Sequence, residues 1–242
     1  MVTTADMVKS NIMRDFRAAV RELKAPADNI AAAQRYAQQV GQAMVEAFRK
    51  NIGDDVLIDG FLPKDAANAL IRDPIIEGWK LITGKTAEIQ TAINNQDGMH
   101  IRALTADVSN SRVNGMAALA SSDTFEKVRV KVYQATPNVM RAAVDKTVQK
   151  NFTSMAEAGV DIQVVRTTSG KCCEWCEGIA LAGPYDYDDV KRGGEVWQRH
   201  LDCNCVIETR IGKRSQRSYV RLRDDEKQRE VNAEISEERR RS

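Results

Sequence analysis

The stretch that decides the fold is KCCEWCEGIALAGPYDYDDVKRGGEVWQRHLDCNC, residues 171–205. It holds all five cysteines of the chain, and the residues before it contain none. The N-terminal sequence has no apolar leader, so we expect a chain made and kept in a reducing compartment. An odd, clustered set of cysteines in such a chain argues against a disulfide framework and for a bound metal ion.

The spacing of these cysteines and of one histidine matches a tetrahedral zinc site. One Cys-x2-Cys pair is followed, after 23 residues, by a His-x2-Cys pair. Each pair fits on one tight turn, so a metal ion held by both pairs closes the loop between them. Thiolates and an imidazole suit zinc better than magnesium or calcium. The predicted ligands are Cys173, Cys176, His200 and Cys203, with Cys205 and Cys172 as alternates.

A zinc ion with four protein ligands has no open coordination position, so the predicted site is structural and activates no water. Its binding energy would fold a small, loop-rich module that has little core of its own. Four aromatic residues, Trp175, Tyr185, Tyr187 and Trp197, are expected to cover the metal rather than stack on nucleic-acid bases. The alternative is a set of free thiols, which predicts purified protein without tightly held zinc.

The residues before the cysteines have the pattern of a helical body, predicted over 1–158. Apolar residues recur at three- and four-residue steps, for example Val40, Met44 and Phe48. Asp28 is the predicted N-cap of the second helix, and Pro74 and Pro137 are predicted to interrupt helices. The expected helical stretches are 4–24, 28–52, 64–72, 74–83, 85–120, with weak points at Gly98 and Gly115, and 124–159, with Gly159 as the C-cap.

The pattern of the sequence changes after residue 159, from helical periodicity to alternation. Residues 160–168 alternate and are rich in β-branched side chains, which predicts a strand, and 205–211 could pair with it. The predicted fold class is α+β: a mainly helical N-terminal body followed by a small zinc-stapled β module. The predicted domains are the body at 1–158, the Cys/His-rich module with flanking strands at 159–211, and a charged tail at 212–242 that is either helical or disordered.

Composition excludes several classes of protein. The 242 residues include 36 Lys and Arg against 34 Asp and Glu, a net charge of +2, so the chain is not a globally basic nucleic-acid binder. Aromatic residues make up only 5%, which favours helices over a β-rich fold. No apolar run approaches the roughly 20 residues of a membrane span. We expect a soluble protein that is made in the cytoplasm.

Residues 150–210 resemble the signature of tailed-bacteriophage minor head proteins, the Mu-F-like head-morphogenesis group. That signature has a helical N-terminal region, an Ala-Gly-x-x strand with an arginine, Cys-x2-Cys, a Leu-Ala-Gly turn, Tyr-x-Tyr and His-x2-Cys-x-Cys. The matching residues are Ala158, Gly159, Arg166, Cys173, Cys176, Leu181, Ala182, Gly183, Tyr185, Tyr187, Trp197, Arg199, His200, Cys203 and Cys205. The extra Cys172 and the longer GIALAG turn depart from the pattern and bear on the choice of ligands.

The resemblance implies a low-copy structural protein of the phage head, located in the virion after synthesis in the bacterial host cytoplasm. Proteins of this group associate with the portal or the inner capsid and assist head assembly, DNA packaging or ejection. The implied partners are therefore the portal and/or the major capsid protein, and no membrane. Because no convergent nucleophile, base or open metal site is evident in the sequence, we expect no enzyme.

The stretch RIGKRSQRSYVRLR, residues 210–223, carries six basic residues and no acidic one. It could contact packaged DNA or an acidic partner, or be a solvated face. The candidate binding residues are Lys213, Arg214, Arg217, Arg221 and Arg223. The alternative function is a zinc-ribbon-like nucleic-acid-binding protein, which the four basic against seven acidic residues of 171–205 disfavour.

The remaining polar residues suggest no second site. His100 has no cysteine near it and is expected to be solvated or to cap a helix. Arg166 could orient a group in a cleft, but an arginine on a strand edge is usually solvated, and we expect that here. The acidic pairs at 54–55 and 188–189 are interpreted as turn residues.

Overall fold

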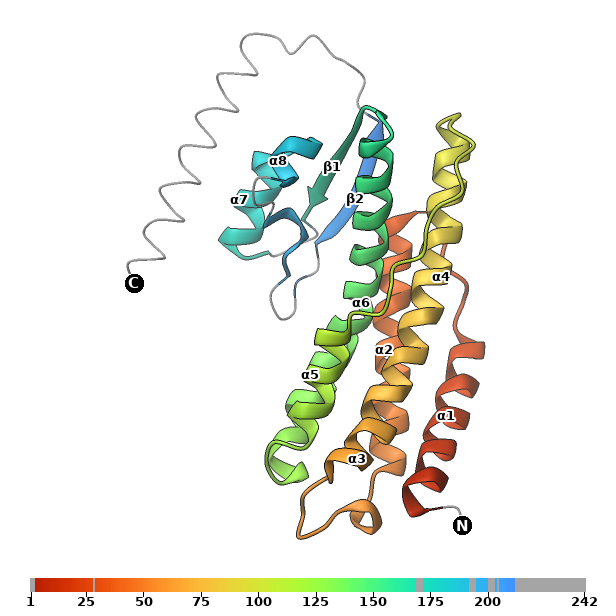
Figure 1. Cartoon of the computed structure of the whole chain (residues 1–242), viewed down its shortest axis with the longest axis vertical. Coiled ribbons are helices and arrows are strands. Elements are labelled where there is room, and N and C mark those ends of the chain that lie inside the picture. Colours follow the sequence, from red (N-terminus) through yellow and green to blue (C-terminus); the bar gives the residue numbers. More distant parts are fainter. Residues whose placement is uncertain are drawn as a thin grey trace, which may run out of the picture. The chain divides into compact units, whose positions relative to one another are not determined.

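We analysed a computed structural model that describes residues 3–27, 29–168, 172–191, 195–199, 203 and 205–211. The chain forms two compact units, Met1–Thr147 and Val148–Ser242, which are described separately below. The predicted α+β class is confirmed: the described residues are mostly helical, with one two-stranded sheet and a cysteine cluster toward the C-terminal end (Figure 1). The domain limits inferred from the sequence remain predictions.

The first unit is built on α1 (Thr4–Glu22) and α2 (Ile30–Asn51). Thr3 and Asp6 form a capping box that satisfies the free N–H groups at the start of α1. The N-cap of α2 is Asn29, whose side chain accepts from the backbone N–H of Ala32 at 2.8 Å; Asp28 lies outside the described residues. The predicted apolar face of α2 is confirmed, because Ile30, Ala33, Ala37, Val40, Met44 and Phe48 are all buried.

The prediction that Pro74 separates two helices is wrong. After the short turn η1 (Asp54–Val56), one uninterrupted helical segment runs through α3 (Lys64–Ala67), a π-helical turn η2 (Asn68–Arg72) and α4 (Asp73–Gln96). Pro74 occupies the first turn of α4, where a missing N–H costs no regular hydrogen bond of that helix. Gly84 likewise lies inside α4 and does not end it.

The predicted stretch 85–120 is broken, at one of its two weak points. Helix α4 ends at Gln96, and Gly98 follows with a φ of +76°, a conformation that glycine adopts without strain. Residues 97–109 are not helical, and helix α5 (Asn110–Ala120) begins after them. Side chains of α4 bind this segment: the indole N–H of Trp79 donates to the carbonyl of Asp107 at 3.1 Å.

The prediction that Pro137 interrupts its helix is also wrong, since α6 runs from Phe125 to Glu157 with Pro137 inside it. Pro137 provides no backbone N–H, but the neighbouring Thr136 and Asn138 side chains donate to the carbonyls of Val132 and Gln134. The backbone of Pro137 lies against Gly41 of α2, where any Cβ would stand 2.5 Å from the proline Cα. Helices α2 and α6 therefore pack closely where Gly41 meets Pro137.

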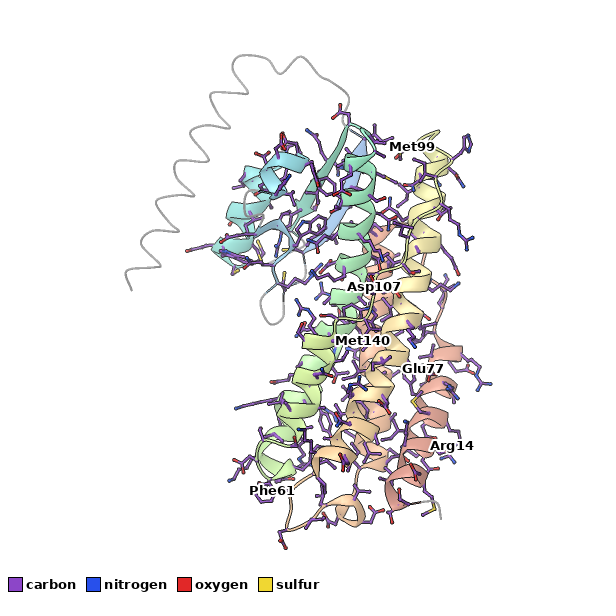
Figure 2. The ribbon with its side chains drawn as sticks, viewed as in Figure 1. Arg14, Phe61, Glu77, Met99, Asp107 and Met140 are labelled. Atoms are coloured by element: carbon purple, nitrogen blue, oxygen red, sulfur yellow. The ribbon has the colours of Figure 1, made fainter. Side chains whose placement is uncertain are left out.

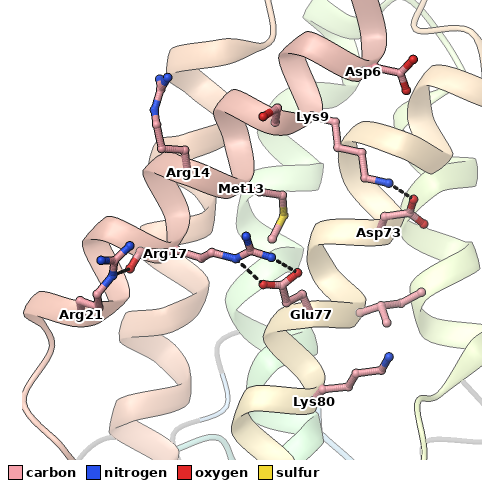
Figure 3. A pocket seen from close by; sticks show the side chains of 11 residues that line it. Asp6, Lys9, Met13, Arg14, Arg17, Arg21, Asp73, Glu77 and Lys80 are labelled. Carbon is pink, nitrogen blue, oxygen red and sulfur yellow. Dashed lines mark hydrogen bonds and ion pairs between the residues drawn. The ribbon is translucent and has the colours of Figure 1, made fainter. Parts of the chain in front are cut away.

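Helices α1, α2 and α4 lie side by side, and ion pairs tie α1 to α4 across a shallow groove (Figures 1 and 3). Lys9 bonds Asp73 at 2.6 Å, and Arg17 holds Glu77 through two hydrogen bonds of 2.7 and 2.9 Å. In the core, Met140 (Figure 2) and Met44 fill the space over Gly78, where an added Cβ would lie within 3 Å of both side chains. The absence of a side chain at position 78 lets α4 pack closely on its neighbours.

The second unit begins with the last turns of α6, whose end is the predicted C-cap. Gly159 has a φ of +84°, and the N–H groups of Gly159 and Val160 bond the carbonyls of Ala156 and Met155, which is the Schellman arrangement. Strand β1 (Ile162–Thr167) then pairs antiparallel with β2 (Val206–Ile211), as the sequence predicted. Between them the structure describes α7 (Glu174–Ala182), α8 (Tyr187–Lys191) and η3 (Glu195–Trp197).

Candidate metal centre

The candidate centre is built on the buried face of β1. Side chains alternate along a strand, so Ile162, Val164 and Arg166 point the same way, and all three are buried. The register pairs Arg166 with Ile207 of β2, two positions beyond Cys205. The two strands therefore bring an arginine and the cysteines that precede β2 to one end of the hairpin.

Three cysteine sulfurs meet there. Cys176 comes from the first turn of α7, and Cys203 and Cys205 come from the segment that leads into β2. Their Sγ atoms all lie within 4.8 Å of one another, and those of Cys176 and Cys203 are 3.7 Å apart. Each of the three residues is only 1–2% exposed, so together they form a small buried thiol cluster.

The expectation that Arg166 is solvated is wrong, because this residue is 1% exposed. Its Nη2 donates to Cys176 Sγ at 3.3 Å and to Cys203 Sγ at 3.2 Å. Its Nη1 donates to the carbonyls of Val196 and Gln198 at 3.1 and 2.6 Å. The guanidinium thus joins the thiol cluster to the segment around η3, from inside the module.

A second arginine holds the backbone around the cluster. Nη1 of Arg199 donates to the carbonyl of Cys205 at 2.7 Å and lies 3.7 Å from Cys203 Sγ. This contact holds the backbone of Cys205 beside the cluster. Both arginines belong to the residues that match the head-protein signature.

Aromatic side chains pack within the module, and among the described residues Trp175 takes the predicted place against the cysteines. Trp175 packs against the cysteines, and the Arg166 guanidinium stands 5.1 Å from the centre of its ring. Phe152 contacts both Trp197 and Tyr187, at centroid distances of 5.9 and 6.2 Å. Tyr185 adds a backbone bridge to β1 and donates its hydroxyl to the carbonyl of Ile179.

The electrostatics favour negative charge on one of the sulfurs, that of Cys203. Burial alone would raise the pKa of Cys203, but a hydrogen bond with the backbone of Cys205 and the charges of Arg199 and Arg166 lower it to about 7. Burial raises the pKa of the Cys176 thiol well above its usual value, and the neighbouring charge of Cys203 raises it further. One thiolate forms readily, whereas a second needs an additional cation beside it.

The donor set fits a tetrahedral thiolate metal ion. Zinc–sulfur bonds of about 2.3 Å in a tetrahedron place the sulfurs about 3.8 Å apart. The 3.7 Å between the Cys176 and Cys203 sulfurs agrees with that spacing and is far longer than the roughly 2.05 Å of a disulfide. Soft thiolates exclude magnesium and calcium as the natural occupants.

The structure brings together some of the predicted ligands and not others. Cys176 and Cys203 lie in the cluster, and the alternate Cys205 joins them. Cys173 is exposed and lies outside the cluster, whereas the half-buried Cys172 packs against the cluster. His200 lies outside the described residues, as do the basic candidates Lys213, Arg214, Arg217, Arg221 and Arg223.

The remaining polar candidates lie elsewhere. His100 is exposed in the first unit, after α4, with a φ of +48°. The acidic pair at 54–55 begins η1, and the pair at 188–189 lies in the first turn of α8, where Asp186 and Asp189 cap each other. The carboxylates of Asp186 and Asp189 thus stabilise the start of α8.

The fold and the cluster define a class: a mostly helical protein with a small cysteine-rich module in which three buried sulfurs lie at the spacing of metal ligands. The chain belongs to the VG15 protein family, whose model matches residues 80–228, more than half of the chain and all of the cysteine-rich segment. This is a family of viral gene proteins, so the chain is a viral gene product. Neither a curated protein nor a solved structure matches the chain.

The helices give one further finding. Among the residues described here, none of the helices is both long enough and apolar enough to cross a lipid bilayer.

Proposed function

We propose that this protein is a minor capsid, or head-morphogenesis, protein of a tailed phage. In this role it is a structural component of the virion that associates with the portal or the inner capsid. There it assists head assembly, DNA packaging or ejection. Membership of a viral gene family supports this proposal, and so does the resemblance of residues 150–210 to the minor head proteins.

The observation that carries the proposal is the convergence of five of the signature residues on one module. Arg166, Cys176, Cys203 and Cys205 meet in the thiol cluster, and Tyr185 bridges to the neighbouring strand β1. In this module each of them has a packing, bonding or ligand role. This is what a shared structural unit requires, because its residues are needed to build the unit rather than to convert a substrate.

We further propose that the cluster holds one zinc ion. Cys176, Cys203 and Cys205 supply three ligands, and His200 is the proposed fourth. The bound ion would supply folding energy, since structural zinc binds with an apparent free energy of about 10–16 kcal/mol in small modules. A two-stranded sheet with three short helical segments gains little from its own apolar core and benefits from such a cross-link.

A non-enzymatic role follows from the same ligand set. Four protein ligands leave no position for water or substrate on the ion. The three described sulfurs are also almost inaccessible to solvent, at 1–2% exposure of their residues. We therefore propose a scaffold role for the module, with portal or major capsid protein as its partner and the 210–223 stretch as a candidate contact for packaged DNA.

Particle composition tests the proposal. The phage that carries this gene is grown, and proheads and mature virions are purified, cross-linked and examined by mass spectrometry. We expect a few copies of the chain per particle, cross-linked to the portal or the major capsid protein. Absence of the chain from both kinds of particle would overturn the proposal, and cross-links to nucleic acid alone would favour the zinc-ribbon alternative.

A further inference from the structure

We infer that Arg166 is the positioning residue of the metal centre: its guanidinium sets the spacing of two thiolate ligands and compensates the charge of the loaded site. This inference rests on the proposed zinc site and names a residue that is not itself a ligand. It reverses the expectation for an arginine on a two-stranded sheet, which would ordinarily extend into solvent.

The geometry of the guanidinium carries the first part of the inference. A single nitrogen, Nη2, lies 3.3 Å from Cys176 Sγ and 3.2 Å from Cys203 Sγ, between two sulfurs that are 3.7 Å apart. Those sulfurs come from α7 and from the segment before β2, 27 positions apart in the chain. A donor shared between them fixes their separation near the value that a tetrahedral metal ion needs.

Hydrogen bonds hold the other side of the guanidinium in place, so the position of the shared donor, Nη2, is fixed. Nη1 bonds the carbonyls of Val196 and Gln198, and the indole of Trp175 lies beneath the cationic carbon at 5.1 Å. Strand β1 supplies the base of the side chain at a position paired with Ile207. The planar fork of arginine can make all these contacts together, whereas the single ammonium of lysine cannot.

The net charge of the zinc-bound cysteines supports the second part of the inference, that Arg166 compensates this charge. Three thiolates and one Zn²⁺ carry a net charge of −1, and a neutral histidine as the fourth ligand leaves that value unchanged. Arg166 adds +1 and makes the buried assembly neutral, so burial at 1–2% exposure has a much smaller desolvation cost. Arg199 brings a second positive charge to 3.7 Å from Cys203 Sγ, but it is partly exposed, so removal of Arg166 would leave the buried negative charge without a buried cation.

Hydrogen bonds to metal-bound sulfur have a spectroscopic signature that simple packing lacks. An N–H donor lowers the energy of the sulfur lone pairs, so the thiolate-to-metal charge-transfer band of a cobalt-substituted site moves to shorter wavelength. Groups outside the ligand shell that orient metal ligands change metal affinity by about 10–100-fold when they are removed. Affinity and band position together distinguish a positioning residue from one that only stabilises the fold.

The test uses the full chain and five proteins: wild type, Arg166→Gln, Arg166→Lys, Arg210→Gln and Val164→Ala. Arg210 lies on β2 of the same hairpin, exposed and paired with Glu208, and so controls for loss of one positive charge. Val164 is buried on the same face of β1 as Arg166, has no polar side-chain atom that could bond sulfur, and so controls for loss of packing. Zinc affinity is measured by competition with a chromophoric chelator, and the cobalt(II) form is measured by absorption spectroscopy.

We expect Arg166→Gln to weaken zinc binding by about 10–100-fold and to shift the cobalt charge-transfer band to longer wavelength. Arg166→Lys should show a smaller loss and a smaller shift, which keeps the test decisive if the glutamine variant does not fold. Val164→Ala should leave the band in place even if affinity falls. Unchanged affinity and band position in both Arg166 variants would overturn the inference alone, whereas wild-type protein that binds no zinc would overturn the proposed metal site as well.

Discussion

Replacement of Gly41 by alanine tests the packing of the helical body. A Cβ at this position would lie 2.5 Å from the Cα of Pro137, 3.0 Å from its Cβ and 3.1 Å from its nitrogen. Two of these atoms are backbone, so no side-chain rotation relieves the overlap. Helices α2 and α6 must move apart to accept the methyl group, and the contacts on both sides of the crossing are loosened.

Two opposing effects set the size of the change. Overpacking of a close contact costs about 1–3 kcal/mol. Alanine gains about 1 kcal/mol over glycine inside a helix. The expected net loss for Gly41→Ala is therefore up to about 2 kcal/mol, and each kcal/mol corresponds to about 2–4 °C in Tm for a chain of this size.

Two other helical glycines supply matched controls. Gly84 in α4 and Gly115 in α5 have no atom within 4 Å of an added Cβ. Alanine at either position should gain about 1 kcal/mol from helix propensity alone. The three variants and the wild type are compared by urea unfolding followed by far-UV circular dichroism. A Gly41→Ala variant as stable as Gly84→Ala would refute the close crossing of α2 and α6.

Two further changes test the module and the body separately. Cys205→Ser should lose stoichiometric zinc, whereas Cys173→Ser, at the exposed position outside the cluster, should keep it. The zinc content of both variants is measured by elemental analysis. Metal loss in the Cys173 variant alone would reverse the ligand assignment. In the body, hydrogen bonds from Asn51 and then Lys50 lower the pKa of Asp15 from 3.8 to about 2. Because the folded pKa is the lower one, its stabilisation is complete above about pH 4 and is lost as the pH falls toward 2. The wild type should therefore lose more stability than Asp15→Asn over that interval in urea titrations, and parallel losses would contradict this role.

Local patterns in the sequence predicted the larger part of the fold. The three- and four-residue spacing of apolar residues identified the buried face of α2, and β-branched alternation identified β1 and its pairing with the segment after Cys205. The two errors at prolines have different causes. Pro74 is harmless in the first turn of α4, and Pro137 is accommodated by a close contact with Gly41 that lies almost a hundred residues away in the chain. Such a long-range contact leaves no local signal.

The sequence predicted the chemistry of the site, a cysteine-rich metal centre, but only some of the residues that form it. Cysteine clustering indicated a metal, and the structure brings Cys176, Cys203 and Cys205 together. Arg166 was assigned to solvent because an arginine on a strand edge is usually solvated. The alternation of side chains along a strand did indicate its burial, since Arg166 shares the face of the buried Ile162 and Val164. What no local pattern supplied was the reason for burial, which is the pair of sulfurs brought in from α7 and the approach to β2.

The metal content of the full chain tests the central claim most directly. The protein is purified under reducing conditions from zinc-supplemented cells, and its mass is measured in native and in denaturing mass spectrometry, with a thermal melt before and after chelation. We predict one zinc per chain in the native spectrum, its release on denaturation, and a lower melting temperature for the second unit after chelation. A native mass equal to that of the bare polypeptide, together with a melt that chelation leaves unchanged, would contradict the account.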